Sequence, residues 1–219
     1  MYQAVIFDLD GTLLNTLPSL VHSGNTVLKK LGYPTHEQDD YRQMVGSGIS
    51  NLVWEMLPKD FRDHQHSTAL KQYRETYKSN LYFDLAPYPG IPELVEILKE
   101  NKIKLAVLSN KSQSYSRELV TSFFPGKFDL VIGAGADYPL KPDPASAQAI
   151  ADFFGLDNSK ILFVGDSNVD MMTAKNANMS ACAVTWGFRS RDELVKAGSD
   201  YVVETAEEIS QLVFNDILK

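Results

Sequence analysis

The stretch Val5-Ile6-Phe7-Asp8-Leu9-Asp10-Gly11-Thr12 joins an apolar run to two aspartates and a glycine. The apolar run, from Ala4 to Phe7, predicts a short buried strand. In an extended chain residues two apart point the same way, so Asp8 and Asp10 can share one cavity, and Gly11 permits a tight turn around a ligand. Because Asp and Gly are also common in turns that simply end a strand, this stretch alone leaves a purely structural role open.

Apolar runs recur along the rest of the chain, and most are followed by residues with helical periodicity. This alternation predicts an α/β fold with a doubly wound, Rossmann-like parallel sheet and ligands at the carboxyl ends of its strands. The expected strands are Ala4 to Phe7, Lys104 to Leu108, Leu130 to Ile132, Ile161 to Val164, Ala181 to Val184 and Tyr201 to Val203. The expected helices are Pro92 to Asn101, Tyr115 to Phe124, Ala145 to Phe154, Val169 to Asn178 and a stretch from Ala206.

The segment from about Leu17 to Leu85 interrupts this alternation, because it has no convincing strand and carries apolar residues at helical spacing. Turn-prone or proline-bearing stretches flank it on both sides. The sequence therefore predicts an α/β core of residues 1–15 and 86–219 and an inserted all-helical cap domain of residues 16–85. The two flanking stretches are suited to act as a hinge.

Composition limits the classes of function. Hydrophobic residues make up 44% of the chain and charged residues 22%, which is the balance of a globular protein with a core. The net charge of −7 disfavours nucleic-acid binding, which uses patches of Lys and Arg. One cysteine allows no intrachain disulfide, and the first residues resemble neither a signal peptide nor a membrane span. We expect a cytoplasmic protein with no membrane partner, either a monomer or a dimer.

Two further groups of polar residues are expected near strand ends. Ser109-Asn110-Lys111 follows the second run and offers a hydroxyl and backbone N–H groups that can hold phosphate oxygens, although capping a helix is the commoner role of such residues. Lys141-Pro142-Asp143-Pro144 offers a cation on a loop that prolines restrict. Most lysines are only solvated surface, but a fixed cation can hold an anion beside carboxylates.

A fourth motif, Gly165-Asp166-Ser167-Asn168-Val169-Asp170, follows the apolar run from Ile161 to Val164. If both acids lie on a helix, their spacing of four places Asp166 and Asp170 on one face. Hard carboxylate oxygens of this kind suit Mg²⁺. The alternative is that these acids cap the next helix and interact with its dipole.

The four motifs, in this order from Val5 to Asp170, resemble those of the haloacid dehalogenase superfamily, and the helical insertion resembles the cap of its phosphoglycolate phosphatase-like members. The resemblance implies a Mg²⁺-dependent phosphatase, a phosphoric monoester hydrolase acting on a small phosphorylated metabolite, with 2-phosphoglycolate favoured. It implies that Asp8 attacks phosphorus to form an aspartyl-phosphate intermediate. Asp10 would protonate the leaving alcohol and then activate water.

The resemblance also implies the remaining site residues. Ser109, the backbone of Asn110 and Lys141 would hold the phosphoryl oxygens, with Gly11 and Thr12 in the same substrate site. The Mg²⁺ ligands would be Asp8, Asp10 through its carbonyl oxygen, Asp166 and, directly or through water, Asp170. In the insertion, Arg42 and Gly46-Ser47-Gly48 resemble a loop that closes over substrate, and a plain glycine-rich turn explains that stretch as well.

Other functions fit the same motifs. A sugar phosphomutase similar to β-phosphoglucomutase would return the phosphoryl group to its substrate, and an inorganic pyrophosphatase would cleave a different phosphate bond. A module that binds phosphate or regulates without turnover is the non-enzymatic alternative, and the intact motif residues argue against it. All four histidines fall in the insertion, so we expect none to act as a general base beside the motifs.

Overall fold

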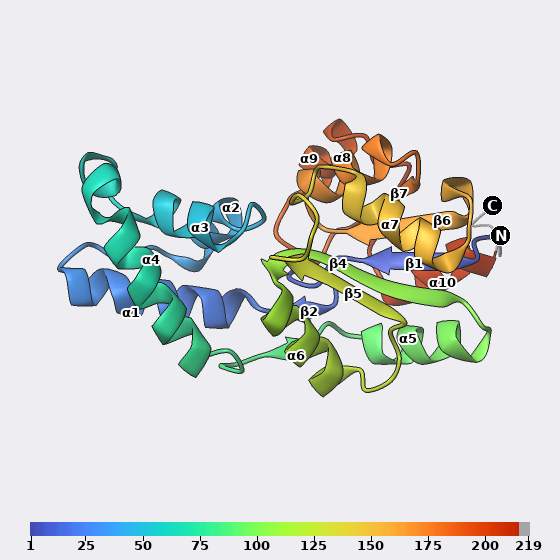
Figure 1. Cartoon of the computed structure of the whole chain (residues 1–219), viewed down its shortest axis with the longest axis horizontal. Coiled ribbons are helices and arrows are strands. Elements are labelled where there is room, and N and C mark those ends of the chain that lie inside the picture. The colour runs from blue at the N-terminus through green and yellow to red at the C-terminus, as the bar shows by residue number, and fades with distance from the viewer. Residues whose placement is uncertain (215–219) are drawn as a thin grey trace. The chain divides into compact units, whose positions relative to one another are not determined.

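The computed structural model describes residues 1–214 and contains a six-stranded sheet in the order β5-β4-β1-β6-β7-β8 (Figure 1). Every neighbouring pair of strands in it is parallel. The predicted doubly wound parallel sheet is therefore confirmed. Its strands are β1 (Ala4–Phe7), β4 (Lys104–Ser112), β5 (Leu130–Ala134), β6 (Ile161–Gly165), β7 (Ser180–Val184) and β8 (Tyr201–Val203).

Helices cover both faces of the sheet (Figure 1). One face packs against α7 (Ala145–Phe154), α8 (Asn168–Asn176) and α9 (Arg191–Lys196), and the other carries α5 (Ile91–Glu100), α6 (Gln113–Phe123) and α10 (Ala206–Phe214). Because both faces are covered, β1 and β6 contain only apolar residues and glycine, and all four residues of β1 are fully buried.

The strand order decides where the polar motifs meet. β1 lies between β4 and β6, and its last residue, Phe7, pairs with Val107 on one side and Val164 on the other. The residues beyond these paired positions, which include the polar end of β4, therefore emerge together, at the point where the strand order reverses. The pairing of β4 with β5 shifts between Leu108 and Ser112, so the intervening residues leave the regular ladder. Such irregularities redirect side chains, and they are common next to active sites.

Residues Asn15–Ala86 form a second compact unit, here called the helical unit. It contains α1 (Leu17–Leu31), α2 (Gln38–Met44), α3 (Ile49–Met56), a 3₁₀ turn (Lys59–Phe61) and α4 (Arg62–Ser79) (Figure 1). Buried Tyr73 and Tyr77 stack with their ring centres 5.8 Å apart, and Gly24 of α1 lets the Tyr41 side chain pack directly on the helix backbone. The other unit, here called the α/β unit, consists of Met1–Leu14 and the chain from Pro87 onward.

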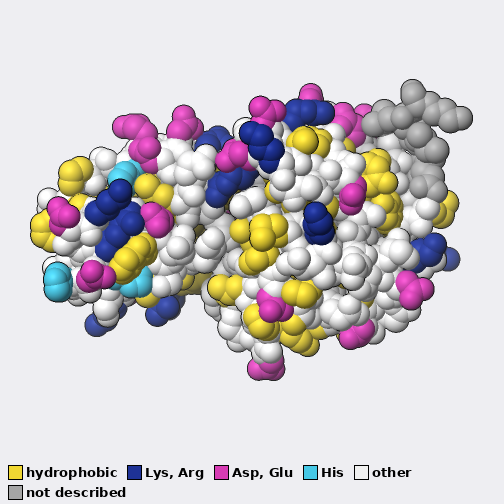
Figure 2. Space-filling view, turned by 90° about the horizontal axis from the view of Figure 1, so that it is seen from above, with side chains coloured by type: hydrophobic (Ala, Val, Ile, Leu, Met, Phe, Trp, Pro, Cys, Tyr) yellow, Lys and Arg dark blue, Asp and Glu magenta, His cyan; other side chains and the backbone are white. Residues whose placement is uncertain are grey.

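Two-residue strands, β2 (Leu14–Asn15) and β3 (Ala86–Pro87), pair where the chain passes between the units. On the face shown in Figure 2, Lys and Arg side chains are interspersed with Asp and Glu, and the histidines seen there lie on the helical unit. Within residues 1–214 no helix has both the length and the apolar character needed to cross a membrane.

Candidate active site

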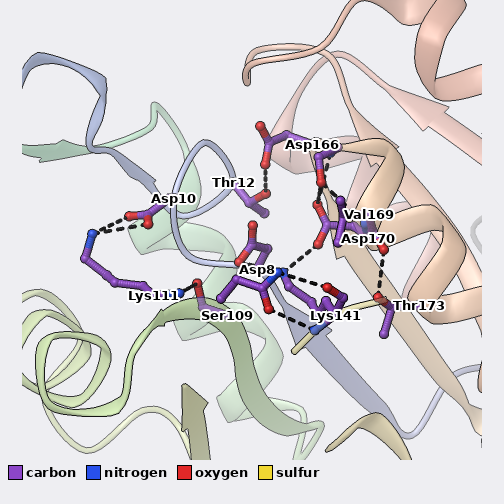
Figure 3. A network of polar contacts seen from close by, with 12 residues as sticks. Asp8, Asp10, Thr12, Ser109, Lys111, Lys141, Asp166, Val169, Asp170 and Thr173 are labelled. Atoms are coloured by element: carbon purple, nitrogen blue, oxygen red, sulfur yellow. Dashed lines mark hydrogen bonds and ion pairs between the residues drawn. The ribbon is translucent and has the colours of Figure 1, made fainter. Parts of the chain in front are cut away.

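A buried group of three aspartates and one lysine lies beyond the carboxyl ends of β1 and β6 (Figure 3). Asp8 directly follows β1, Asp166 directly follows β6, and Asp170 lies in the first turn of α8; these three are here called the acidic cluster. One carboxylate oxygen from each lies within 4.8 Å of the other two. Lys141 Nζ is 2.9 Å from Asp8 Oδ1 and 2.6 Å from Asp170 Oδ1, so one buried cation joins two of the three acids.

Asp166 is held by donors from two other loops. The Thr12 hydroxyl donates to Oδ1 at 3.0 Å, and the backbone N–H of Phe188 donates to Oδ2 at 2.8 Å. Trp186 in turn donates its indole N–H to the Thr12 carbonyl at 3.1 Å, which ties the loop after β7 to the loop after β1. Glycine is needed at Gly11 and Gly187, because a Cβ at either position would lie within 2.3 Å of the Asp166 side chain.

Asp170 caps the next helix, which is one of the two roles that the sequence leaves as alternatives. The backbone N–H and hydroxyl of Ser167, the N-cap of α8, donate to Asp170 Oδ2 at 3.0 and 2.6 Å, while Oδ1 faces Lys141. Asp166 and Asp170 do not meet the condition for sharing a helix face, because α8 begins only at Asn168. Asp166 reaches the cluster because it ends β6, the strand beside β1.

Burial and neighbouring charges shift the pKa values of the acidic cluster and of Lys141. Burial raises the pKa of Asp8 to about 7, a shift that Lys141 opposes and that the charges of Asp170 and Asp10 increase. Burial, with the charges of Asp170 and Asp8, also raises the pKa of Asp166 well above its ordinary value. Burial alone lowers the pKa of Lys141, but the charges of Asp170 and Asp8 outweigh burial and raise it above the ordinary value. Lys141 therefore stays charged, and the cluster favours additional positive charge.

Asp10 has a different partner. Lys111 Nζ lies 2.9 Å from Asp10 Oδ1 and 3.1 Å from Oδ2, and Figure 3 shows the two side chains pointing toward each other. The two aspartates of the first motif are thus held by different lysines, Asp8 by Lys141 and Asp10 by Lys111.

Ser109 and Asn110 also lie in the α/β unit, and both are buried. Ser109 Oγ accepts a hydrogen bond of 3.3 Å from the Lys111 backbone N–H, and the Asn110 side chain bonds to the backbone of Lys141. Gly11 has a φ of +84°, which suits the turn expected there.

The four remaining candidates belong to the helical unit. Arg42 lies on α2, where its Nε is 3.3 Å from Asp39 Oδ1, and Gly46, Ser47 and Gly48 connect α2 to α3. Gly46 and Gly48 have φ values of +124° and +86°, so their glycines are explained by backbone conformation alone.

Four contacts of the site are not anticipated by the sequence: those of Lys111, Ser167, Phe188 and Trp186. The motif Ser109-Asn110-Lys111 predicts no role for Lys111, although a residue two positions after Ser109 points the same way in an extended chain. The pattern Ser167-x-x-Asp170 is a capping-box signature that could have located the start of α8. The contacts of Phe188 and Trp186 join distant segments, and no local pattern predicts them.

Comparison with known proteins shows the family to which the chain belongs. A family model described as haloacid dehalogenase-like hydrolase matches residues 5–184. The chain belongs to the haloacid dehalogenase-like hydrolases. The predicted family membership is thereby confirmed, and the match spans all four motifs.

Relatives of this hydrolase are similar over nearly their whole length. A phosphoglycolate phosphatase of Aquifex aeolicus is 28% identical over 218 residues, which cover 99% of each chain. Another from Neisseria meningitidis is 31% identical, over 94% of this chain and 92% of the relative. A crystal structure of a protein from Lactobacillus delbrueckii subsp. bulgaricus superposes with a TM-score of 0.91 at 30% identity, covering 97% of this chain and 98% of the other.

Proposed function

We propose that this hydrolase is a phosphatase that cleaves a small phosphate monoester, with 2-phosphoglycolate as the favoured substrate, through an aspartyl-phosphate on Asp8. The observation that carries the proposal is the pairing of buried Asp8 with Lys141 at 2.9 Å inside a cluster of further acids. Such a cluster is costly to bury, and perturbed carboxylates of this kind are typical of catalytic sites. The substrate is favoured because both relatives described above are phosphoglycolate phosphatases.

Asp8 is the proposed nucleophile. Its carboxylate lies at the end of a fully buried strand, so its position is fixed by the sheet. A carboxylate oxygen attacks phosphorus, and the bond from phosphorus to the leaving oxygen breaks to give an acyl phosphate. Lys141 balances the negative charge that gathers as the phosphoryl group approaches Asp8, and the hydroxyl of Ser109 can donate to a phosphoryl oxygen.

Asp10 is proposed as the acid and base. It follows Asp8 by two residues, and its carboxylate is paired with Lys111 rather than with Lys141. In the first step it gives a proton to the departing alcohol oxygen, and in the second it takes a proton from the water that cleaves the acyl phosphate. Two carboxylates with separate partners can take these separate roles.

The acidic cluster fits Mg²⁺, and Asp8, Asp166 and Asp170, together with the carbonyl oxygen of Asp10, would hold it. The carboxylate oxygens of the cluster are hard ligands that converge within 4.8 Å, and burial together with mutual repulsion raises the pKa of Asp8 and Asp166. When bound, the ion supplies positive charge that neutralises phosphoryl oxygens. Thr12 and the Phe188 N–H keep Asp166 oriented for this purpose, and Ser167 does the same for Asp170.

The helical unit is proposed to act as a cap that excludes water during the first step. Arg42 and the turn from Gly46 to Gly48 are its proposed substrate contacts, with the guanidinium suited to a substrate carboxylate. Structures determined with and without a phosphate mimic, such as tetrahedral tungstate, test the cap. A helical unit in the same position in both would contradict it.

The proposed function is tested by measuring orthophosphate released from 2-phosphoglycolate and from a panel of phosphorylated metabolites with Mg²⁺ present. Asp8→Asn should lower the rate by more than about 10³-fold while the fold, followed by circular dichroism, is unchanged. Asp137→Asn, at an exposed loop position, is the matched control and should keep the wild-type rate. Phosphate transferred to a second hydroxyl instead of released would indicate a mutase, and turnover that survives Asp8→Asn would overturn the nucleophile assignment.

A further inference from the structure

Lys111 is a buried lysine without a place in the mechanism derived so far. Its side chain is 5% exposed, although a lysine is ordinarily kept in water because burying an ammonium ion is costly. Its Nζ contacts both carboxylate oxygens of Asp10, whose side chain is 15% exposed. The buried ammonium group of Lys111 therefore offsets the charge of Asp10.

The backbone of Lys111 is anchored from two sides. Its N–H donates to Ser109 Oγ at 3.3 Å, and its carbonyl accepts from the Ser116 hydroxyl, on α6, at 3.3 Å. These contacts lie in the part of β4 where pairing with β5 shifts. The side chain thus starts from a fixed point at the end of β4, the strand next to β1.

The charges around Asp10 explain why it needs such a partner. Asp8 and the other members of the acidic cluster are carboxylates, and they repel a further negative charge nearby. Lys141 is already paired with Asp8 and Asp170. Lys111 supplies the attraction that holds Asp10 against this repulsion, and its two contacts, one to each carboxylate oxygen, fix how the carboxylate is turned.

We propose that Lys111 is a positioning residue that holds the Asp10 carboxylate in the orientation from which it exchanges a proton with the leaving oxygen, an inference that rests on the proposed function. In the first step an Asp8 oxygen bonds to phosphorus, the bond between phosphorus and the leaving oxygen breaks with its electron pair staying on that oxygen, and the proton that Asp10 carries into this step transfers to it. An alkyl leaving group requires this proton, whereas a nitrophenolate leaves without it. Loss of Lys111 therefore affects the two substrate types differently.

The experiment compares wild type with Lys111→Met in single-turnover reactions at enzyme excess, following alcohol release from an alkyl phosphate that the wild type accepts and from p-nitrophenyl phosphate. Alcohol release reports the first step alone, before Asp10 acts as a base. We expect the rate for the alkyl phosphate to fall by about 10²-fold and that for the aryl phosphate by less than about 3-fold. Lys111→Arg, which keeps the charge, should recover most of the loss. Lys99→Met removes an ion pair with Asp129 on the same unit and should change neither rate.

Equal losses on both substrates, or no loss on either, would overturn the positioning role while leaving the proposed function intact. A wild type that hydrolyses neither substrate overturns the proposed function and this inference with it. Should Lys111→Met fail to fold, Lys111→Gln, which retains a hydrogen-bond donor without the charge, is measured in the same way. A structure of either variant gives a readout independent of turnover, and an Asp10 carboxylate in its original orientation would contradict the inference.

Discussion

Asn110 and Lys141 are joined by two reciprocal hydrogen bonds: Asn110 Nδ2 donates to the Lys141 carbonyl at 3.1 Å, and the Lys141 N–H donates to Asn110 Oδ1 at 2.8 Å. Both residues are buried. The amide side chain therefore fixes the backbone from which the Lys141 ammonium reaches Asp8, and the residue after Ser109 acts on a loop more than thirty positions away.

Asn110→Ala should lower both stability and activity. Two buried backbone groups lose their partners, which costs about 1–3 kcal/mol of unfolding free energy. Displacement of Lys141 from Asp8 should lower kcat by about 10- to 100-fold, measured by steady-state phosphate release. Asn158→Ala is the control, because Asn158 also donates two side-chain hydrogen bonds, to Gln148 Oε1 and the Ala177 carbonyl. It should lose stability but keep kcat, and a comparable loss of kcat in both variants would contradict the prediction.

Gly11→Ala should displace Asp166. A Cβ at this position would lie 2.3 Å from Asp166 Oδ2, and the residue has a φ of +84°. We expect kcat/KM to fall at least about 10²-fold and the Mg²⁺ dependence of the melting temperature to weaken. Gly155→Ala is the control for backbone strain. Gly155 also has a positive φ, of +65°, but an added Cβ there would have nothing within 4 Å and would displace no side chain. That control should cost only about 1–2 kcal/mol of stability, with full activity.

Local sequence patterns are sufficient to predict the strands of the sheet and the edge of the sheet at which the polar motifs lie. Strands buried on both faces are largely apolar, so each strand of the large sheet can be located by an apolar run, and the expected bounds Ala4–Phe7 and Tyr201–Val203 agree with the structure to the residue. The helix α9 was missed because its six residues are too few to show a helical period, although Ser190 and Glu193 form its capping box.

The partners within the site could not be predicted in the same way. The sequence indicates that Asp8, Asp10, Lys111 and Lys141 all follow strands, but which lysine pairs with which acid depends on contacts between residues about a hundred or more positions apart. Likewise, a spacing of four places Asp166 and Asp170 on one face only if both lie on a helix. The strand β6 continues one residue further than its apolar run, to Gly165, and places Asp166 before the helix.

Stability of the metal-free protein should fall as pH rises from about 4 to above 7. The pKa of Asp8 is about 7 in the folded protein against an ordinary 3.8, so the folded state binds more protons in this interval and loses that advantage as the pH increases. The raised pKa of Asp166 acts in the same direction. For Asp8 the shift corresponds to roughly 4 kcal/mol as an upper bound.

Melting temperatures between pH 5 and pH 8, with EDTA and with Mg²⁺, measure this effect. Mg²⁺ should reduce the slope, because it stabilises the charged carboxylates and competes with their protons. Asp166→Asn removes one of the crowded charges, so it should flatten the metal-free curve and reduce the stabilisation by Mg²⁺. A melting temperature of the metal-free protein that rises between pH 5 and pH 8 would contradict the prediction.

The two capping boxes on α8 and α9 allow the role of Asp170 in the site to be separated from its role in the helix. In each, a serine N–H and hydroxyl donate to one oxygen of an acid three residues later, Asp170 in α8 and Glu193 in α9. Only Asp170 is buried and only Asp170 faces Lys141 through its second oxygen. Asp170→Asn and Glu193→Gln both keep an oxygen that can accept from the serine, so each removes mainly the charge.

Asp170→Asn should therefore lower kcat/KM by about 10- to 100-fold, because Lys141 loses one of its two carboxylate partners and the acidic cluster loses a ligand charge. Its apparent affinity for Mg²⁺, obtained from the metal dependence of phosphate release, should weaken by a similar factor. Glu193→Gln should reduce unfolding free energy by less than about 1 kcal/mol and leave both kinetic quantities unchanged. Asp170 differs from Glu193 in that its charge faces Lys141. If kcat/KM and the apparent Mg²⁺ affinity were the same in the two variants, that charge would have no role in the site and Asp170 would only cap α8.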